Sequence, residues 1–208
     1  MKLILENWRG YIKEAEVPYK EIQAIIDGNQ YLKGKINATP DTIYDMGDRY
    51  FLMSGVSHIA ERHRDKCFPG SLFLVDDSVV KEAILKIVKE MPPEAGKVLA
   101  VSSGVSQLGM ERLVKSSAEE IAELEDYKMK DGTMIKIKKE GQNPGQVTDR
   151  LTVIAPVIGT ASGKPVLSLV TAFPGFMGTG AGGDGDVEIK NRADFTKNGY
   201  YFLIPETC

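Results

Sequence analysis

The chain has 208 residues, of which 42% are hydrophobic and 26% are charged, and its formal net charge at pH 7 is −3. This composition is typical of a soluble globular protein that can build a sizeable core. The mild acidity argues against a broad basic surface for non-specific binding of duplex nucleic acid, although it leaves room for one small basic pocket. No apolar run approaches the roughly 18 residues of a membrane span.

Residues 1–16 are predicted to form an amphipathic leader or docking helix. Apolar residues recur there at helical spacing: Leu3, Ile4, Trp8, Tyr11 and Ile12. Pro18 ends the periodic stretch. The opening LILENWR resembles leaders of proteins from aquatic phages, which indicates a viral source. The remaining residues, 17–208, are predicted to form a single α+β domain.

Two helices are expected in the first half of this domain. The segment EIQAIIDG, residues 21–28, suits either a helix or a strand. Ser57 is a plausible N-cap for a short helix that ends at His63 or Arg64, before Pro69-Gly70. Residues 76–91 give the clearest helix, with one apolar stripe consisting of Val79, Val80, Ala83, Ile84, Ile87 and Val88.

Strands dominate the second half. A strand is predicted over residues 97–103, helix in one or two pieces over 108–126, and a hairpin over 126–139 that turns at Asp131-Gly132. A second hairpin joins two β-rich runs through residues 159–163, and residues 199–205 make the last strand. Helices followed by antiparallel strands predict an α+β fold with N-terminal helices packed on a central antiparallel sheet.

The cysteines are Cys67 and Cys208, which are too few for a disulfide scaffold. Their number predicts a reducing, intracellular compartment. Cys67 lies four residues after His63, but neighbours on a short helix seldom converge into a catalytic dyad. We therefore expect Cys67, beside Phe68, to be half-buried and inert.

Both histidines of the chain lie in the basic stretch SHIAERHRDKCF, residues 57–68. His58 and His63 are five positions apart, which separates them by about 140° around a helix. A helical two-histidine zinc site needs a spacing of four, and the sequence offers no third histidine. The spacing therefore argues against a metal site and predicts no cofactor.

A glycine-rich stretch later in the chain matches a phosphate-binding string. The segment GTGAGG, residues 178–183, fits the pattern Gly-x-Gly-x-x-Gly but does not join a strand to a helix. Its context instead predicts a surface loop.

The basic stretch can also be read as an acid–base and phosphate site. His58 and Arg62 are four residues apart, so one helical face would carry an imidazole and a guanidinium together. Arg64 and Lys66 extend the cationic patch. Histidine gives and takes protons near neutral pH, and cations stabilise a phosphorane. These residue types are therefore sufficient for RNA cleavage without a metal ion. The alternative is a solvated helix end with a structural histidine packed beneath it.

A second stretch, LSLVTAFPG at residues 167–175, extends this reading. A His-Ile-x-x-Arg-His helix, an amphipathic helix and a closing Val-Thr-Ala-aromatic-Pro strand together resemble phage-borne nucleases of the barnase, EndoU, colicin and RelE type (BECR). The resemblance implies helices on a four- or five-stranded antiparallel sheet and metal-free RNA cleavage. Relative to that pattern, this chain carries a long insertion at about 103–148. It places the helix histidine on His58 or His63, the arginine on Arg62, and the strand hydroxyl on Thr171, with Ser168 as an alternative.

The family's aromatic residue falls on Phe173, where the common residue is tyrosine, so a phenolic hydroxyl is absent here. Phe173 then either stacks on a base or belongs to the core. The predicted function is a phage endoribonuclease acting on tRNA or mRNA in the host bacterial cytoplasm, with no membrane partner. The alternatives are a non-catalytic protein that binds a host protein or a nucleotide, and a cargo packaged in a virion.

Overall fold

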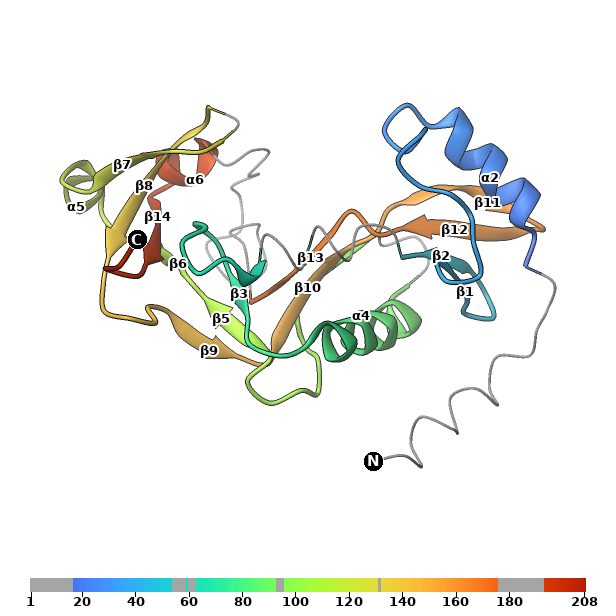
Figure 1. The fold of residues 1–208 in the computed structure, drawn as a ribbon, viewed down its shortest axis with the longest axis horizontal. Coiled ribbons are helices and arrows are strands. Elements are labelled where there is room, and N and C mark those ends of the chain that lie inside the picture. Colours follow the sequence, from blue (N-terminus) through green and yellow to red (C-terminus); the bar gives the residue numbers. More distant parts are fainter. Residues whose placement is uncertain (1–16, 54–58, 60–62, 93–95, 131, 176–192) are drawn as a thin grey trace. The chain divides into compact units, whose positions relative to one another are not determined.

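The structure is a computed structural model that describes residues 17–53, 59, 63–92, 96–130, 132–175 and 193–208 (Figure 1). The chain divides into two compact units. The first unit comprises residues 1–55, 88–97 and 154–171, and the second comprises residues 56–87, 98–153 and 172–208. Among the described helices, none is long and apolar enough to cross a membrane.

The first unit contains one four-stranded sheet with a helix packed on it. Its elements are α2 (Tyr19–Gly28), β1 (Ile43–Asp45), β2 (Tyr50–Leu52), β11 (Val157–Ala161) and β12 (Lys164–Ser168), with the strand order β1-β2-β12-β11. Strand β12 pairs antiparallel with β11 and parallel with β2. Residues 21–28, which suited helix or strand, are therefore helical.

The helix α2 is fixed by its buried face. Ile22 and Ile26, one turn apart, are fully buried against residues of the sheet such as Val166. A Cβ added at Gly159 of β11 would lie 2.9 Å from Ile25 Cγ2. The absence of a side chain at this glycine therefore lets α2 approach the sheet.

The second unit holds the other elements wholly or mostly within it. These are β3 (Leu72–Phe73), α4 (Asp77–Glu90), β4 (Lys97–Ser102), β5 (Gly109–Glu111), β6 (Leu113–Lys115), α5 (Ala118–Ala122), β7 (Glu125–Lys128), β8 (Met134–Lys139), β9 (Gln146–Thr148), β10 (Arg150–Ile154), β13 (Thr171–Pro174), α6 (Ala193–Lys197) and β14 (Tyr200–Ile204). The strands form three sheets, ordered β6-β14-β8-β7, β13-β10-β4 and β3-β5-β9.

The sheet β6-β14-β8-β7 carries a hydrophobic cluster of this unit. Ile135 and Ile137 alternate with Lys136 along β8, and their side chains are buried. Phe202 of β14 and Phe195 of α6 meet edge to face, with ring centroids 5.4 Å apart. The predicted hairpin is confirmed as β7 and β8, which pair from Lys128 and Met134 onwards.

The predicted helix over residues 108–126 is wrong except over residues 118–122. The structure places β5 and β6 there, and the helix α5 covers residues 118–122 alone. Gly109 lies so close to its neighbours that an added Cβ would come within 2.2 Å of Pro174 Cγ. Pairing of β5 with β3 and β9 has therefore overridden the helical spacing of the apolar residues.

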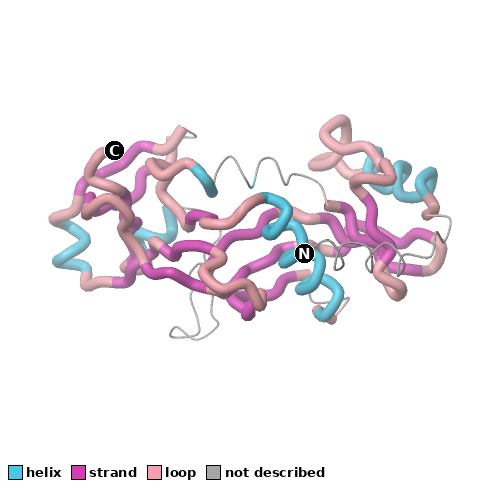
Figure 2. Tube along the Cα trace, turned by 60° about the horizontal axis from the view of Figure 1, so that its bottom comes forward, coloured by secondary structure: helices cyan, strands magenta, loops and turns pink. Residues whose placement is uncertain are grey.

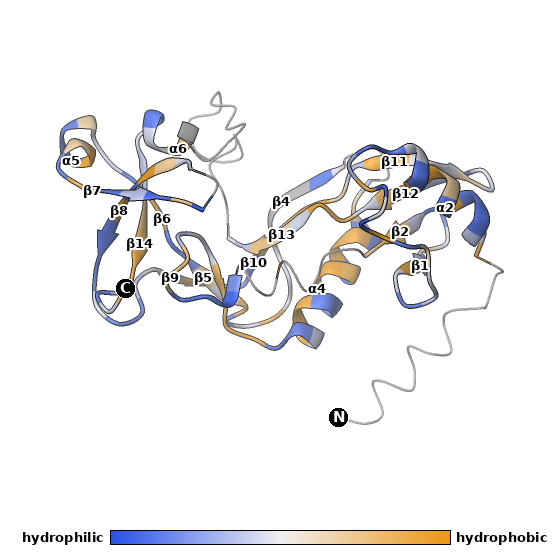
Figure 3. Cartoon of the chain, turned by 45° about the horizontal axis from the view of Figure 1, so that its top comes forward, coloured by the Kyte–Doolittle hydropathy of each residue, from blue (hydrophilic) through white to orange (hydrophobic). Residues whose placement is uncertain are grey.

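The chain as described is a mixed α and β protein with several sheets and few helices (Figure 2). The predicted helix over residues 76–91 is confirmed as α4, which carries both apolar and hydrophilic residues (Figure 3). The buried residues of its apolar stripe are Val80, Ala83, Ile84, Ile87 and Val88. The predicted second hairpin is confirmed as β11 and β12, while its two flanking runs each divide into two strands. The predicted leader helix over residues 1–16 lies outside the described residues.

Candidate functional site

The imidazole of His63 is packed inside the second unit. The residue is 5% exposed, and its ring stacks on Phe173 with centroids 6.1 Å apart and meets Phe73 edge to face at 5.9 Å. Its Nδ1 lies 2.7 Å from the carbonyl oxygen of Ser71. Because a carbonyl can only accept, Nδ1 carries the proton and donates this bond. The geometry thus suits His63 to holding its segment in place, with little access for a substrate.

The contact between His63 and Phe173 brings together the two stretches on which the resemblance rests. Phe173 lies in β13 and is 4% exposed, so the phenyl ring is a core group in this structure and has no free face for a base. The aromatic pair joins His63 of the basic stretch to this strand. The ring that would stack on RNA therefore stacks on a histidine instead.

The two basic residues that follow His63 are placed differently. Arg64 is exposed and binds Asp77 in the first turn of α4, with Nε 2.9 Å from Oδ1, and its Nη2 donates to the carbonyl of Val75 at 2.6 Å. Lys66 is exposed, and its backbone carbonyl accepts a hydrogen bond from Arg112. A phosphate at Arg64 would have to compete with a carboxylate, although an ion pair at the surface is weak.

The remaining predicted site residues fall in three places. Thr171 is half-buried at the start of β13, and Ser168 is fully buried at the end of β12, where its Oγ has no hydrogen-bond partner in the described part of the chain. These two belong to the first unit, whereas His63 and Phe173 belong to the second. His58 and Arg62 lie outside the described residues, as does the glycine-rich stretch at 178–183.

A buried arginine, Arg112, was missed by the sequence analysis. The residue has no exposed surface, and its Nε and Nη1 donate to the carbonyls of Pro144 and Lys66 at 3.2 and 2.7 Å. Its Nη2 has no hydrogen-bond partner within the described ranges. Burial lowers the pKa of Arg112 below its usual range, because desolvation disfavours the charged form. A helix over residues 108–126 would have left the Arg112 side chain free to reach solvent. The incorrect helix prediction therefore gave no indication that this arginine is buried.

A polar groove lies on the second unit beside this arginine. It holds about 510 Å³ and is lined by Glu111, Leu113, Val114, residues 140–146 and Leu203. Glu111 and Glu140 are the charged residues of this lining. None of the predicted site residues lines this groove.

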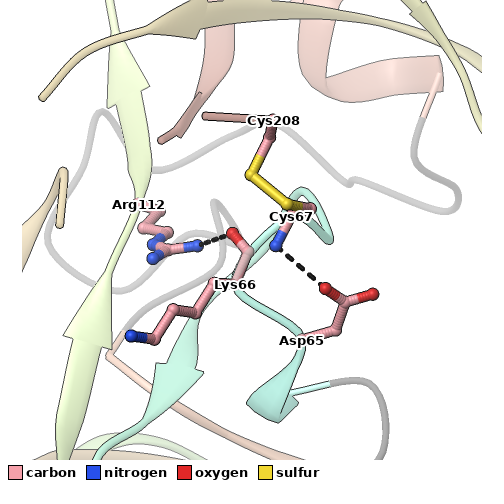
Figure 4. The surroundings of a disulfide bond; sticks show 5 residues. All are labelled: Asp65, Lys66, Cys67, Arg112 and Cys208. Carbon is pink, nitrogen blue, oxygen red and sulfur yellow. Dashed lines mark hydrogen bonds between the residues drawn. A yellow bond between two sulfur atoms is a disulfide. The ribbon is translucent and has the colours of Figure 1, made fainter. Parts of the chain in front are cut away.

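The prediction that Cys67 is half-buried and inert is wrong. Cys67 is exposed and forms a disulfide with Cys208, 141 positions away in the sequence (Figure 4). The two Cα atoms are 5.4 Å apart, which is the usual spacing for such a bond. The inference of a reducing compartment from cysteine usage therefore loses its basis.

Comparison with protein-family models, with curated proteins and with solved structures finds no match for this chain. Within the described ranges, no group of three or more His, Cys, Asp or Glu side chains is placed to hold a metal ion. The chemistry of the chain therefore has to be argued from its own residues.

Proposed function

We propose that the chain is a metal-independent endoribonuclease whose proton-transfer group is His58 and whose phosphate-binding cation is Arg62. The packing of His63 against Phe173 carries this proposal, because it anchors the one described histidine of the basic stretch to β13. Of the two histidines, His63 has a structural partner in the Ser71 carbonyl. The proton-transfer role therefore falls to the other histidine.

In the proposed reaction, neutral His58 takes the proton of the ribose 2′-hydroxyl as its oxygen attacks the adjacent phosphorus. The bond from phosphorus to the 5′ oxygen breaks, and the imidazolium returns a proton to that leaving oxygen. The products are a 2′,3′-cyclic phosphate and a 5′-hydroxyl. The guanidinium of Arg62 stabilises the charge that develops on the phosphorane oxygens. The role of Thr171 as a phosphate-binding hydroxyl stays a prediction of the resemblance.

The test is cleavage of bulk tRNA by the purified full chain in the presence of a chelator, read as 2′,3′-cyclic phosphate ends. We expect His58→Ala and Arg62→Ala each to slow cleavage by about 10²- to 10⁴-fold, the usual contribution of a positioned acid–base group or charge. A wild-type chain that yields no cyclic ends, or a His58→Ala variant that cleaves at the wild-type rate, refutes the proposal.

Asparagine at position 63 provides the matched control. The amide nitrogen of His63→Asn can replace Nδ1 as the donor to the Ser71 carbonyl, whereas His63→Ala leaves that carbonyl unpaired in an aromatic pocket. We expect His63→Asn to keep most of the cleavage rate and His63→Ala to lose thermal stability together with rate. Equal and complete loss in both variants at unchanged stability would assign proton transfer to His63 itself.

A non-catalytic binding protein is the second candidate. It is favoured by the burial of both rings that the resemblance assigns to the site, His63 and Phe173. In this case the chain would retain RNA, a nucleotide or a host protein without turnover. The same tRNA experiment separates the two functions, because retention of labelled tRNA without cyclic ends supports binding alone.

A further inference from the structure

The disulfide Cys67–Cys208 lies where solvent can reach it. Both cysteine residues are exposed. Cys67 N donates to Asp65 Oδ1 at 2.9 Å, a bond within the same short segment, whereas Glu206 N donates to the Gly141 carbonyl at 2.9 Å and so fixes the Cys208 side to the rest of the unit. A thiolate from outside can therefore attack a sulfur of this bond, and the strands of the unit do not depend on it for their pairing.

Beside the disulfide lies the buried guanidinium of Arg112. Its Nη1 donates to the carbonyl of Lys66, the residue that precedes Cys67, so the disulfide-bonded segment contacts the arginine directly (Figure 4). Its contacts among the described residues are two carbonyls, and its Nη2 has none. A buried cation without a carboxylate, and with an unsatisfied nitrogen, favours any rearrangement that admits water. Hydration of the guanidinium therefore favours opening of the segment that contacts Arg112.

We propose that the Cys67–Cys208 disulfide is a redox latch that keeps residues 65–68 closed over Arg112, and that its reduction opens this segment and hydrates the guanidinium. The reductant is a dithiol. One of its thiolates attacks one sulfur of the latch, which forms a mixed disulfide and releases the other cysteine as a thiolate. The second thiol of the reductant then displaces the remaining cysteine. The two protons of the dithiol end on Cys67 and Cys208, and the dithiol leaves as a disulfide.

The experiment measures the labelling of arginines in the full chain by phenylglyoxal, mapped by mass spectrometry of peptides, with and without dithiothreitol. We expect the labelling rate of Arg112 to rise by about tenfold or more on reduction, as for a site governed by local opening. Arg150, which is exposed, should label equally in both states and serves as the reference. Hydrogen exchange of the β8 and β14 amides, which belong to the same unit, should stay unchanged.

The matched variants remove the bond without a reductant. Cys208→Ser and Cys67→Ser should each label Arg112 at the rate of the reduced wild type, and neither should respond to dithiothreitol. Three results would overturn the proposal: two free thiols in the air-oxidised protein, an Arg112 rate that does not change once two thiols have been released, or loss of β8 and β14 protection together with the increase. The readout is independent of RNA cleavage.

Discussion

Among the described residues, each unit buries one arginine, and the hydrogen-bond partners of these two arginines differ. Arg49 of the first unit is 3% exposed, and Arg112 of the second has no exposed surface. Arg49 binds the Asp48 carboxylate through Nε and Nη2 at 2.8 and 2.7 Å. Its Nη1 donates to the carbonyl of Val88, in the last turn of α4, and to the carbonyl of Met91, the residue after the helix. All three nitrogens of the Arg49 guanidinium are therefore satisfied.

Arg112 has neither a carboxylate partner nor a full set of hydrogen bonds in the part of the chain that the structure describes. The consequence appears in the two pKa shifts. Hydrogen bonding to Arg49 lowers the pKa of Asp48, whereas desolvation lowers the pKa of Arg112 itself. Arg49 thus stabilises the ionised carboxylate that it binds, whereas Arg112 is buried at a cost to its own charge. Burial alone does not say which role an arginine has; the partners of its nitrogens do.

The largest effect that distinguishes the two is expected from Arg49→Met. This change keeps the length of the side chain but leaves the Met91 and Val88 carbonyls without their donor and Asp48 without its partner. We expect the free energy of unfolding to fall by about 2–3 kcal/mol, measured by urea denaturation. Asp48 is largely exposed, which keeps the estimate below the cost of breaking a wholly buried pair.

The exposed arginine Arg150 gives the control for this measurement. Its replacement by methionine should change the free energy of unfolding by less than about 0.5 kcal/mol. If Arg49→Met behaved like Arg150→Met, the contacts of Arg49 would contribute nothing to stability, and the conclusion that Arg49 stabilises the first unit would be wrong.

Local patterns in the sequence were sufficient for the elements that local contacts decide. The alternation around Ile135 and Ile137 predicted β8, and the apolar stripe of residues 79–88 predicted α4. Residues 108–126 were misread because their apolar spacing also suits a helix, while the close packing of Gly109 against Pro174 depends on a strand far along the chain. A periodic pattern cannot report such a contact.

In the candidate site, too, the sequence indicated the local features but not the contacts between distant residues. Sequence spacing identified a basic stretch and a later strand, and the structure joins them through His63 and Phe173. The burial of His63 could not be predicted, because it depends on Phe73 and Phe173, which lie 10 and 110 positions away. The disulfide was missed for a related reason, since a pair of cysteines separated by 141 positions has no local signature.

The second test replaces Arg112 with methionine. The variant loses the bonds to the Lys66 and Pro144 carbonyls, but it also removes a desolvated charge, so the two effects offset each other. We expect the free energy of unfolding in urea to change by less than about 1 kcal/mol, in contrast to Arg49→Met. A loss as large as that of Arg49→Met would mean that Arg112 is as well compensated as Arg49.

The smallest effect is the pH dependence of the pair formed by Asp48 and Arg49. The folded-state pKa of Asp48 is lowered, mainly by its hydrogen bond from Arg49, so the pair stabilises the fold above the unfolded-state pKa of about 4 and loses this effect as the pH falls through the lower, folded-state value. Because Asp48 is more than half exposed, we expect Asp48→Asn to cost less than about 1 kcal/mol at pH 7. The difference between wild type and variant in thermal unfolding should shrink steadily below pH 4. A difference that stays constant down to pH 2 would mean that the ionised carboxylate contributes nothing, and that Arg49 is held by the carbonyls of Val88 and Met91 alone.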